Sequence, residues 1–222
     1  MCGRFTLTVS GEEVAEAFGL QETPRLEPRY NIAPSQPIAA VRAGSTGASR
    51  HLAFLRWGFL PTSGARGRLL LINARAETLG RRPAFREAFE RRRCLVPADG
   101  FYEWKALEGA RRKQPYYFRL VDGRPFALAA LWEPPPADDP SGPGACTLVT
   151  TAPNGLLAPV HDRMPALLDR DDYDAWLAPE ERSGPRLSAL LRPFPAERMT
   201  GFPVGFSVND PRNDSPDCCR PA

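Results

Sequence analysis

In the stretch CLVPADGFYEW, residues 94–104, a strand-like run turns sharply at ADG and continues into a second polar and aromatic segment. Gly100 permits such a turn. Other short apolar runs, each bounded by Gly, Pro or Ser, surround this stretch and favour strands over helices. They are PIAAV (37–41), LAFLRWGF (52–59), LLLIN (69–73), YYFRLV (116–121), FALAALW (126–132), TLVTT (147–151) and GFPVGFSV (201–208).

A few segments have helical patterns instead. SGEEVAEAF (10–18) has a capping box, and RRPAFREAFERRR (81–93) places Pro83 in its first turn and Phe85, Ala88 and Phe89 on one face. DDYDAWL (171–177) and PRLSALL (185–191) are shorter candidates, and EPPPADDPSGPGA (133–145) reads as a loop between two strands. The pattern predicts one mixed α+β domain over residues 1–210, with a curled, largely antiparallel, barrel-like sheet and a coil tail over residues 211–222.

Composition limits the classes of partner. The 222 residues carry 29 basic and 26 acidic side chains, a net charge of +3, so a nucleic acid must be held by a local patch. The five cysteines form no C-x-x-C pair and there are two histidines, so we expect no metal and no cofactor. No apolar run approaches the roughly 20 residues that span a bilayer. We therefore expect a cytoplasmic monomer without a membrane partner.

The chain opens MCGRF, which places Cys2 behind a removable Met1. Loss of Met1 would leave Cys2 with a free α-amine and a thiol on adjacent carbons. Their reference pKa values are about 7.7–8.0 and about 8.5, so both nucleophiles are partly available near neutral pH. On position alone, Cys2 is equally well explained as a small apolar residue beneath a strand.

Two stretches place polar side chains beside apolar ones. In LLLINARAET, period-2 alternation puts Asn73, Arg75 and Glu77 on one face, although strand ends often have this pattern for structural reasons. In ADGFYEWK, Glu103 is crowded by Tyr102 and Trp104, which would raise its pKa towards that of a general acid. The alternative is that Glu103 lies on the solvated face of its strand.

The stretch VHDRMP places His161 beside an aspartate and an arginine that can set its protonation state. A partly buried structural histidine is the competing interpretation. Six arginines between residues 81 and 93, and the ARRK of residues 110–113, are candidates for a phosphate-binding surface together with Arg4 and Arg75. Solvated faces with ion pairs would give the same pattern.

In chain order, MCGRF, RYNIAP, RWGFLP, INARAET, CLVPADGFYEWK, LVTTAPN, VHDRMP and RNDSPDC resemble the SRAP family, named for SOS-response-associated peptidase. The resemblance covers almost the whole chain. It implies a DNA damage response protein with a positively charged cleft that crosslinks to abasic sites in single-stranded DNA through Cys2, by thiazolidine formation. Autoproteolytic removal of Met1 would come first.

The resemblance also implies roles for individual residues. Cys2, Asn73, Glu103 and His161 match the catalytic positions, and the positions near DNA are Arg4, Pro34, Trp57, Gly58, Arg75 and Thr150. Family members often carry tryptophans after RWGFLP that wedge into DNA. Here TSGARGR (62–68) has none, so a wedge is in doubt.

Two other classes of protein remain open at this point. An N-terminal-nucleophile thiol hydrolase, either a glutamine amidotransferase or a Cys2–His161 peptidase, would use the same first residue. Arg4 stands where amidotransferases usually continue with an apolar run. A reversible reader of modified DNA bases is the non-enzymatic alternative.

Overall fold

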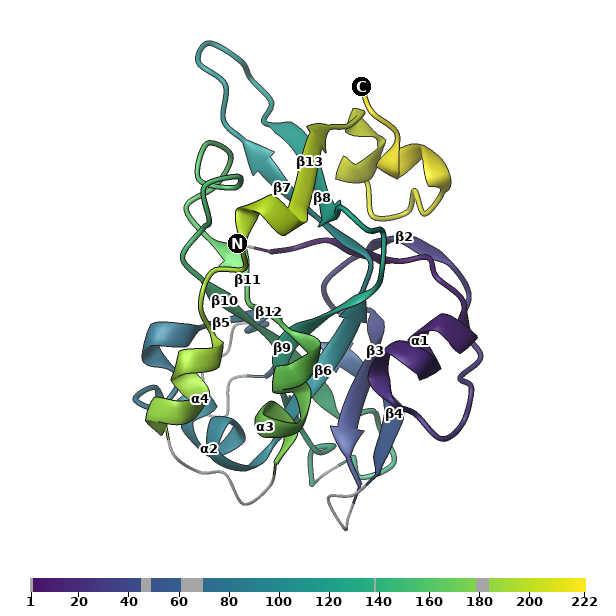
Figure 1. Cartoon of the computed structure of the whole chain (residues 1–222), viewed down its shortest axis with the longest axis vertical. Coiled ribbons are helices and arrows are strands. Elements are labelled where there is room, and N and C mark those ends of the chain that lie inside the picture. The colour runs from purple at the N-terminus through teal and green to yellow at the C-terminus, as the bar shows by residue number, and fades with distance from the viewer. Residues whose placement is uncertain (1, 45–48, 61–69, 138, 179–183) are drawn as a thin grey trace.

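The computed structural model describes residues 2–44, 49–60, 70–137, 139–178 and 184–222, and within them the chain forms one mixed α+β unit built on two sheets (Figure 1). The larger sheet closes on itself because β10 pairs with both β4 and β9. Its strands are β3 (Pro37–Ala43), β4 (Arg50–Trp57), β5 (Asn73–Arg75), β6 (Arg93–Ala98), β9 (Phe126–Glu133), β10 (Ala145–Thr151), β11 (Met164–Pro165) and β12 (Leu167–Leu168).

The predicted curled and largely antiparallel sheet is confirmed. Around the ring the order is β10, β4, β3, β6, β9 and back to β10. Only the pairings of β10 with β4 and with β5 are parallel in the described part of the chain. The ring strands are buried on both faces, since successive residues such as Leu95 and Val96 on β6 and Leu128 to Leu131 on β9 are completely buried.

The second sheet carries the amino terminus. Its order is β13-β8-β7-β1-β2. The strands are β1 (Phe5–Leu7), β2 (Arg29–Ile32), β7 (Gly100–Lys105), β8 (Gln114–Leu120) and β13 (Met199–Pro203). All neighbouring strands in it run antiparallel.

The chain passes from one sheet to the other at Asp99. CLVPADGFYEW is therefore two strands, with β6 in the ring ending at Ala98 and β7 in the second sheet beginning at Gly100. A side chain at Gly100 has no room, because its Cβ would stand 2.1 Å from the Tyr117 hydroxyl. The absence of a Cβ at this one position lets β7 lie against β8.

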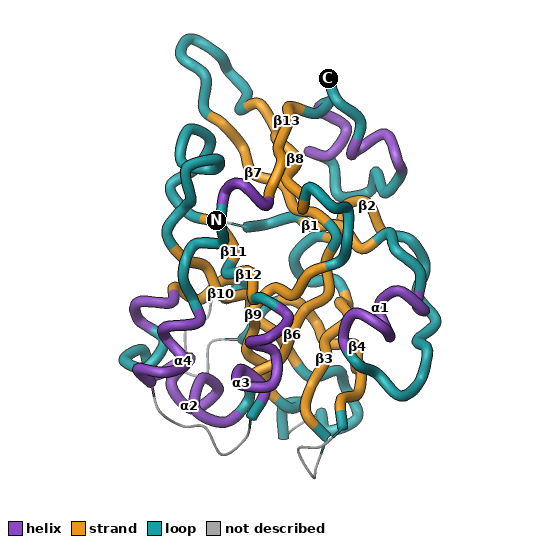
Figure 2. The backbone as a smooth tube through the Cα atoms, viewed as in Figure 1, coloured by secondary structure: helices purple, strands orange, loops and turns teal. Residues whose placement is uncertain are grey.

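Helices cover the outside of the ring sheet (Figure 2). The capping box predicted for the first helix is present, since Ser10 and Glu13 exchange hydrogen bonds at 3.2 and 2.9 Å. Phe85, Ala88 and Phe89 form the buried face of the second helix, as predicted. The α-helices are α1 (Gly11–Phe18), α2 (Pro83–Arg91), α3 (Tyr173–Leu177) and α4 (Gly184–Leu190). The 3-10 turns are η1 (Ala76–Thr78), η2 (Arg170–Asp172), η3 (Ala196–Arg198), η4 (Phe206–Asn209) and η5 (Pro216–Cys219).

Two local predictions are wrong. The strand expected in LLLIN begins only at Asn73, and the alternation from Asn73 ends at Arg75 because Glu77 lies in η1. The run GFPVGFSV is a strand only to Pro203 and then enters η4. No helix in the described ranges is both long and apolar enough to cross a bilayer.

Candidate active site at the amino terminus

The pairing of β1 with β7 brings the first residues to Glu103. Phe5 pairs with Phe101, and the Tyr102 amide donates to the Arg4 carbonyl at 3.0 Å. Cys2 therefore runs beside the part of β7 that carries Glu103. Its side chain is completely buried, and its carbonyl accepts a 2.8 Å hydrogen bond from Nδ2 of Asn73.

Asp99 fixes β1 in this position. Its carboxylate accepts hydrogen bonds from the Thr6 hydroxyl, the Thr8 hydroxyl and the amides of Thr8 and Val9. Tyr117 lies 3.0 Å from the Thr6 hydroxyl. Charge-assisted hydrogen bonds of this kind are among the stronger ones in proteins. The ADG turn thus does more than redirect the chain, because it anchors the strand that leads back to Cys2.

Glu103 and His161 meet beside Cys2. Glu103 is 1% exposed, and its Oε2 lies 3.8 Å from Nε2 of His161. Burial raises the pKa of Glu103 to about 7. Both protonation states of this carboxyl group are therefore populated at neutral pH, which suits an acid and base catalyst. The direction of the pKa shift was predicted but its cause was not, because Tyr102 and Trp104 lie on the other face of β7, where they bond to Tyr30 and Asn209.

His161 is held in a defined tautomer. Its Nδ1 lies 3.0 Å from the donating amide of Arg163 and 2.9 Å from the carboxylate of Asp162. A single nitrogen cannot accept from the first and donate to the second. The amide is fixed by the backbone, whereas the Asp162 side chain is 87% exposed and can turn away. Burial lowers the pKa of His161, so we infer a neutral ring with its proton on Nε2, facing Glu103.

The Cys2 thiol is protonated in this environment. Burial, and then the negative charge of Glu103, raise its pKa above the usual range. The thiol lies 3.8 Å from the Arg4 carbonyl. Asn73, Glu103, His161 and Cys2 are thus brought together from four separate stretches of sequence.

Asn73, which contacts Cys2, and Thr150 both have unused hydrogen-bonding atoms. They lie on neighbouring strands, since Leu148 pairs with Asn73 and Thr150 with Arg75. The Oδ1 of Asn73 and the hydroxyl of Thr150 are buried and have no hydrogen-bond partner among the described residues. Buried polar atoms without a partner are uncommon and call for an explanation, such as a bound molecule.

The other predicted DNA-binding residues divide into two groups. Arg75 is exposed, whereas Arg4 is half-buried and its Nε is buried without a hydrogen-bond partner among the described residues. Trp57 is completely buried, where it packs edge-on against Phe5 and donates to the Ile72 carbonyl at 2.9 Å. Gly58 follows this tryptophan in the chain. Pro34 lies nearby, because the amide of the next residue, Ser35, donates to the Trp57 carbonyl. Contacts of any of these residues with DNA stay a prediction.

Sequence reasoning missed Arg163. Its guanidinium binds both carboxylate oxygens of Glu77, at 2.7 and 3.0 Å, and the Thr150 carbonyl at 2.6 Å. It therefore ties the His161 loop to the strands that carry Asn73 and Thr150. Its place two residues after His161 was the only available signal.

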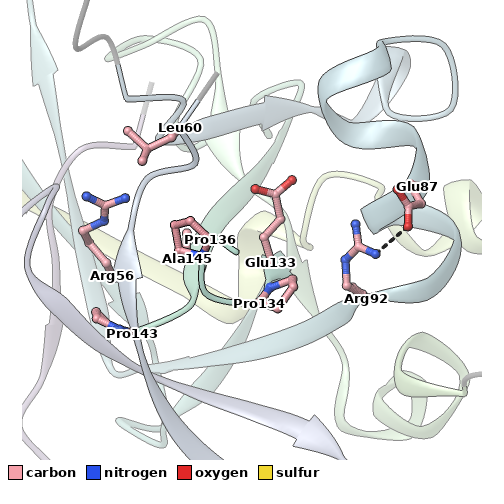
Figure 3. A pocket seen from close by; sticks show the side chains of 9 residues that line it. All are labelled: Arg56, Leu60, Glu87, Arg92, Glu133, Pro134, Pro136, Pro143 and Ala145. Atoms are coloured by element: carbon pink, nitrogen blue, oxygen red, sulfur yellow. Dashed lines mark hydrogen bonds and ion pairs between the residues drawn. The ribbon is translucent and has the colours of Figure 1, made fainter. Parts of the chain in front are cut away.

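A separate pocket of about 400 Å³ contains none of the predicted site residues (Figure 3). Glu133 lies between Arg56 and Arg92 in this view, and Arg92 pairs with Glu87 at 2.7 Å. The pocket includes Ala145 at the start of β10, whereas Thr150 lies five residues further on, or about 16 Å along an extended strand. The pocket and the Cys2 site are at different ends of this strand.

Within the described residues no group of three or more His, Cys, Asp or Glu side chains could hold a metal ion. The segment TSGARGR, where the wedge tryptophans are missing, lies outside the described residues.

Comparisons with known proteins agree with the motif pattern. The family model described as SOS response associated peptidase (SRAP) matches residues 1–211. The abasic site processing protein YoqW of Bacillus subtilis is 38% identical over 98% of both chains. The abasic site processing protein YedK of Escherichia coli is 30% identical over 100% of both. A crystal structure of a protein from Bacteroides thetaiotaomicron shares the fold, with a TM-score of 0.85 and 24% identity over 100% of both chains. Because the family model covers nearly the whole chain, this protein belongs to the SRAP family.

Proposed function

We propose that this protein processes abasic sites by forming a covalent crosslink between Cys2 and single-stranded DNA. One observation carries the proposal: the first residue of a Met1-processed chain is held by Asn73 beside a buried carboxyl group with a pKa of about 7. Relatives across the full length are named abasic site processing proteins, which supports the same substrate lesion here.

The chemistry uses both nucleophiles of Cys2. The α-amine attacks the C1′ aldehyde of the opened deoxyribose, and loss of water gives a Schiff base. The thiol then adds to the imine carbon, and its proton passes to the imine nitrogen. The product is a five-membered thiazolidine, and one water molecule is released overall. The second bond from the same residue keeps the adduct from hydrolysing as a simple Schiff base does.

Glu103 supplies the proton transfers. In its protonated form it donates to the ring oxygen as the sugar opens and to the hydroxyl group that leaves as water. In its ionised form it accepts the thiol proton, which burial otherwise holds on sulfur. Neutral His161, 3.8 Å away, relays protons to and from this carboxyl group.

The site is less suited to a thiol hydrolase. A cysteine protease or amidotransferase needs a thiolate, and such thiols have lowered pKa values. Burial moves the pKa of Cys2 in the opposite direction. A thiol that adds late to a neighbouring imine does not have to ionise before the amine reacts.

The test uses a single-stranded oligonucleotide with one abasic site. We expect the wild-type protein to give an adduct that survives denaturing electrophoresis without a reductant. Cys2→Ser keeps the α-amine, so its adduct should require borohydride trapping. Cys219→Ala, which removes a thiol from the tail, should behave as wild type. The absence of a wild-type adduct, or an equal adduct from Cys2→Ala, would refute the proposal.

A further inference from the structure

The loop between β7 and β8 forms an exposed basic arm. Residues 106–113 are all exposed, and they project beyond the body of the second sheet (Figure 1). Arg111, Arg112 and Lys113 lie on its returning limb, against a single acidic residue, Glu108. In the described part of the chain none of these three cations has an ion pair.

The base of the arm adjoins the candidate active site. Glu103 pairs with Tyr116, and two residues further along, Lys105 pairs with Gln114. Alternation along β7 puts Glu103 and Lys105 on the same face, about 7 Å apart. Burial lowers the pKa of His161, and the positive charge of Lys113 contributes in the same direction. The field of the arm therefore reaches the site.

Two of the six arginines in the other arginine-rich segment are occupied by structural contacts. Arg93 is buried and donates to the carbonyls of Phe89, Glu90 and Trp176, and Arg92 pairs with Glu87. The remaining exposed arginines of this segment belong to or flank α2, which contacts β6 and β9 of the ring sheet. The basic arm instead belongs to the same hairpin as Glu103.

We propose that the basic arm, residues 106–113, binds the phosphates of the DNA segment that flanks the abasic nucleotide. This inference rests on the proposed function, since it takes the Cys2 site as the position of the lesion. Arg111 and Arg112 offer planar, bidentate donors for phosphate oxygens, and Lys113 adds a third cation nearest to the site. The arm thus extends the binding surface past Glu103 without taking part in the chemistry.

The test separates binding from reaction. The variant Arg111→Gln/Arg112→Gln/Lys113→Gln is compared with wild type on an oligonucleotide that carries a tetrahydrofuran abasic analogue, which has no aldehyde. Binding is measured across NaCl concentrations. Loss of three phosphate contacts should reduce the slope of log K against log salt by about 2, because each contact to a single strand contributes about 0.7. Crosslinking to a true abasic site at saturating DNA should fall by a smaller factor than the affinity for the analogue.

A matched control removes the same charge elsewhere. Arg81→Gln/Arg86→Gln/Arg91→Gln also neutralises three exposed arginines. The slope of log K against log salt for this variant should differ from the wild-type slope by less than about 0.7, the contribution of one phosphate contact. An unchanged slope in the arm variant, or a larger loss in the α2 variant, would overturn the proposal. So would a wild-type protein that does not bind the analogue. A wild-type protein that binds the analogue with the expected slope but forms no adduct would refute the proposed function and leave the arm as a DNA-binding surface.

Discussion

The side-chain amide of Asn73 donates to the carbonyl of Cys2 at 2.8 Å, across 71 residues of sequence. This hydrogen bond joins β5 of the ring sheet to the chain segment that enters the second sheet. The position of Cys2 is therefore set by both sheets. Asp99 adds to this control from the opposite end of β1.

Replacing Asn73 should slow crosslinking more than it weakens DNA binding. Asn73→Ala removes a hydrogen bond worth about 1 kcal/mol, so the rate at saturating DNA should fall about five- to tenfold. Asn73→Asp should be at least as slow, because it turns a lone pair towards the Cys2 carbonyl. Asn213→Ala, which removes a side-chain bond to the Ser207 carbonyl, is the matched control. A wild-type rate in both Asn73 variants would contradict this role.

The rate of crosslinking should depend on pH through Glu103. Its protonated form declines above a pKa of about 7, while the free α-amine increases towards about 7.7–8.0. We expect a rate maximum between these values. Glu103→Gln should react more slowly and keep only the limb that rises with pH. Single-turnover rates between pH 5 and 9 provide the measurement, and a wild-type profile that only rises would argue against Glu103 as the acid.

Glu103 should also make the fold less stable as pH rises. Its pKa is about 7 when folded and about 4.3 in an unfolded chain, so the folded state binds more protons between these values. The contribution of Glu103 to the free energy of unfolding is therefore largest below about pH 4.3, and it is lost as the pH rises to about 7. Glu103→Gln cannot ionise, so it abolishes this loss. Because ionisation of Glu103 costs the folded wild type about 2 kcal/mol between pH 5 and pH 8, the melting temperature of Glu103→Gln relative to wild type should be about 4–8 °C higher at pH 8 than at pH 5.

Glu77 is the control for this pH dependence. Its hydrogen bonds from Arg163 lower the pKa of its carboxyl, which is ionised at both pH 5 and pH 8. The effect of Glu77→Gln should thus be equal at the two pH values. Equal effects of Glu103→Gln at the two pH values would contradict the raised pKa.

Local sequence patterns predicted the elements better than their pairings. The Ser10–Glu13 capping box and the apolar face of α2 depend on neighbours within one or two turns, so the sequence carries their signals directly. Ring closure depends on β10 pairing with β9, β4 and β5 at once. No local pattern specifies such a combination.

The candidate site shows the same division. The sequence predicted the raised pKa of Glu103, although Tyr102 and Trp104, which lie on the other face of β7, do not cause it. For Asn73 and His161, residue patterns alone favoured structural roles, and only the combined family motifs selected them as site residues. The hydrogen bonds between Arg163 and Glu77 join residues 86 positions apart. Glu77 can make them because β5 ends at Arg75, so Glu77 is no longer part of the alternating strand. Period-2 reasoning could not anticipate that stop.

Gly100 should tolerate no side chain while Tyr117 is present. The Cβ of Gly100→Ala would lie 2.1 Å from the Tyr117 hydroxyl and 2.2 Å from its Cζ. Such overpacking costs about 1–3 kcal/mol, which lowers the melting temperature by about 2–12 °C. Tyr117→Leu also destabilises the protein, but the double variant should be less damaged than the sum of both. Gly80→Ala, with open space around it, should change little. If the loss of stability in the double variant equals the sum of the losses in the two single variants, Gly100→Ala does not clash with Tyr117.

Asp214 should stabilise the protein although it lies beyond the predicted domain boundary at residue 210. Its carboxylate accepts hydrogen bonds from the amides of Tyr30 and Asn31 and from the Arg29 guanidinium, and Cys218 behind it is completely buried. Asp214→Asn should therefore cost about 1–3 kcal/mol in thermal or urea unfolding, and deletion of residues 211–222 should cost more. Asp217→Asn breaks only an exposed pair with Arg220 and should cost less than about 0.5 kcal/mol. If the deletion leaves the melting temperature unchanged, residues 211–222 are a dispensable tail and the boundary at residue 210 is correct.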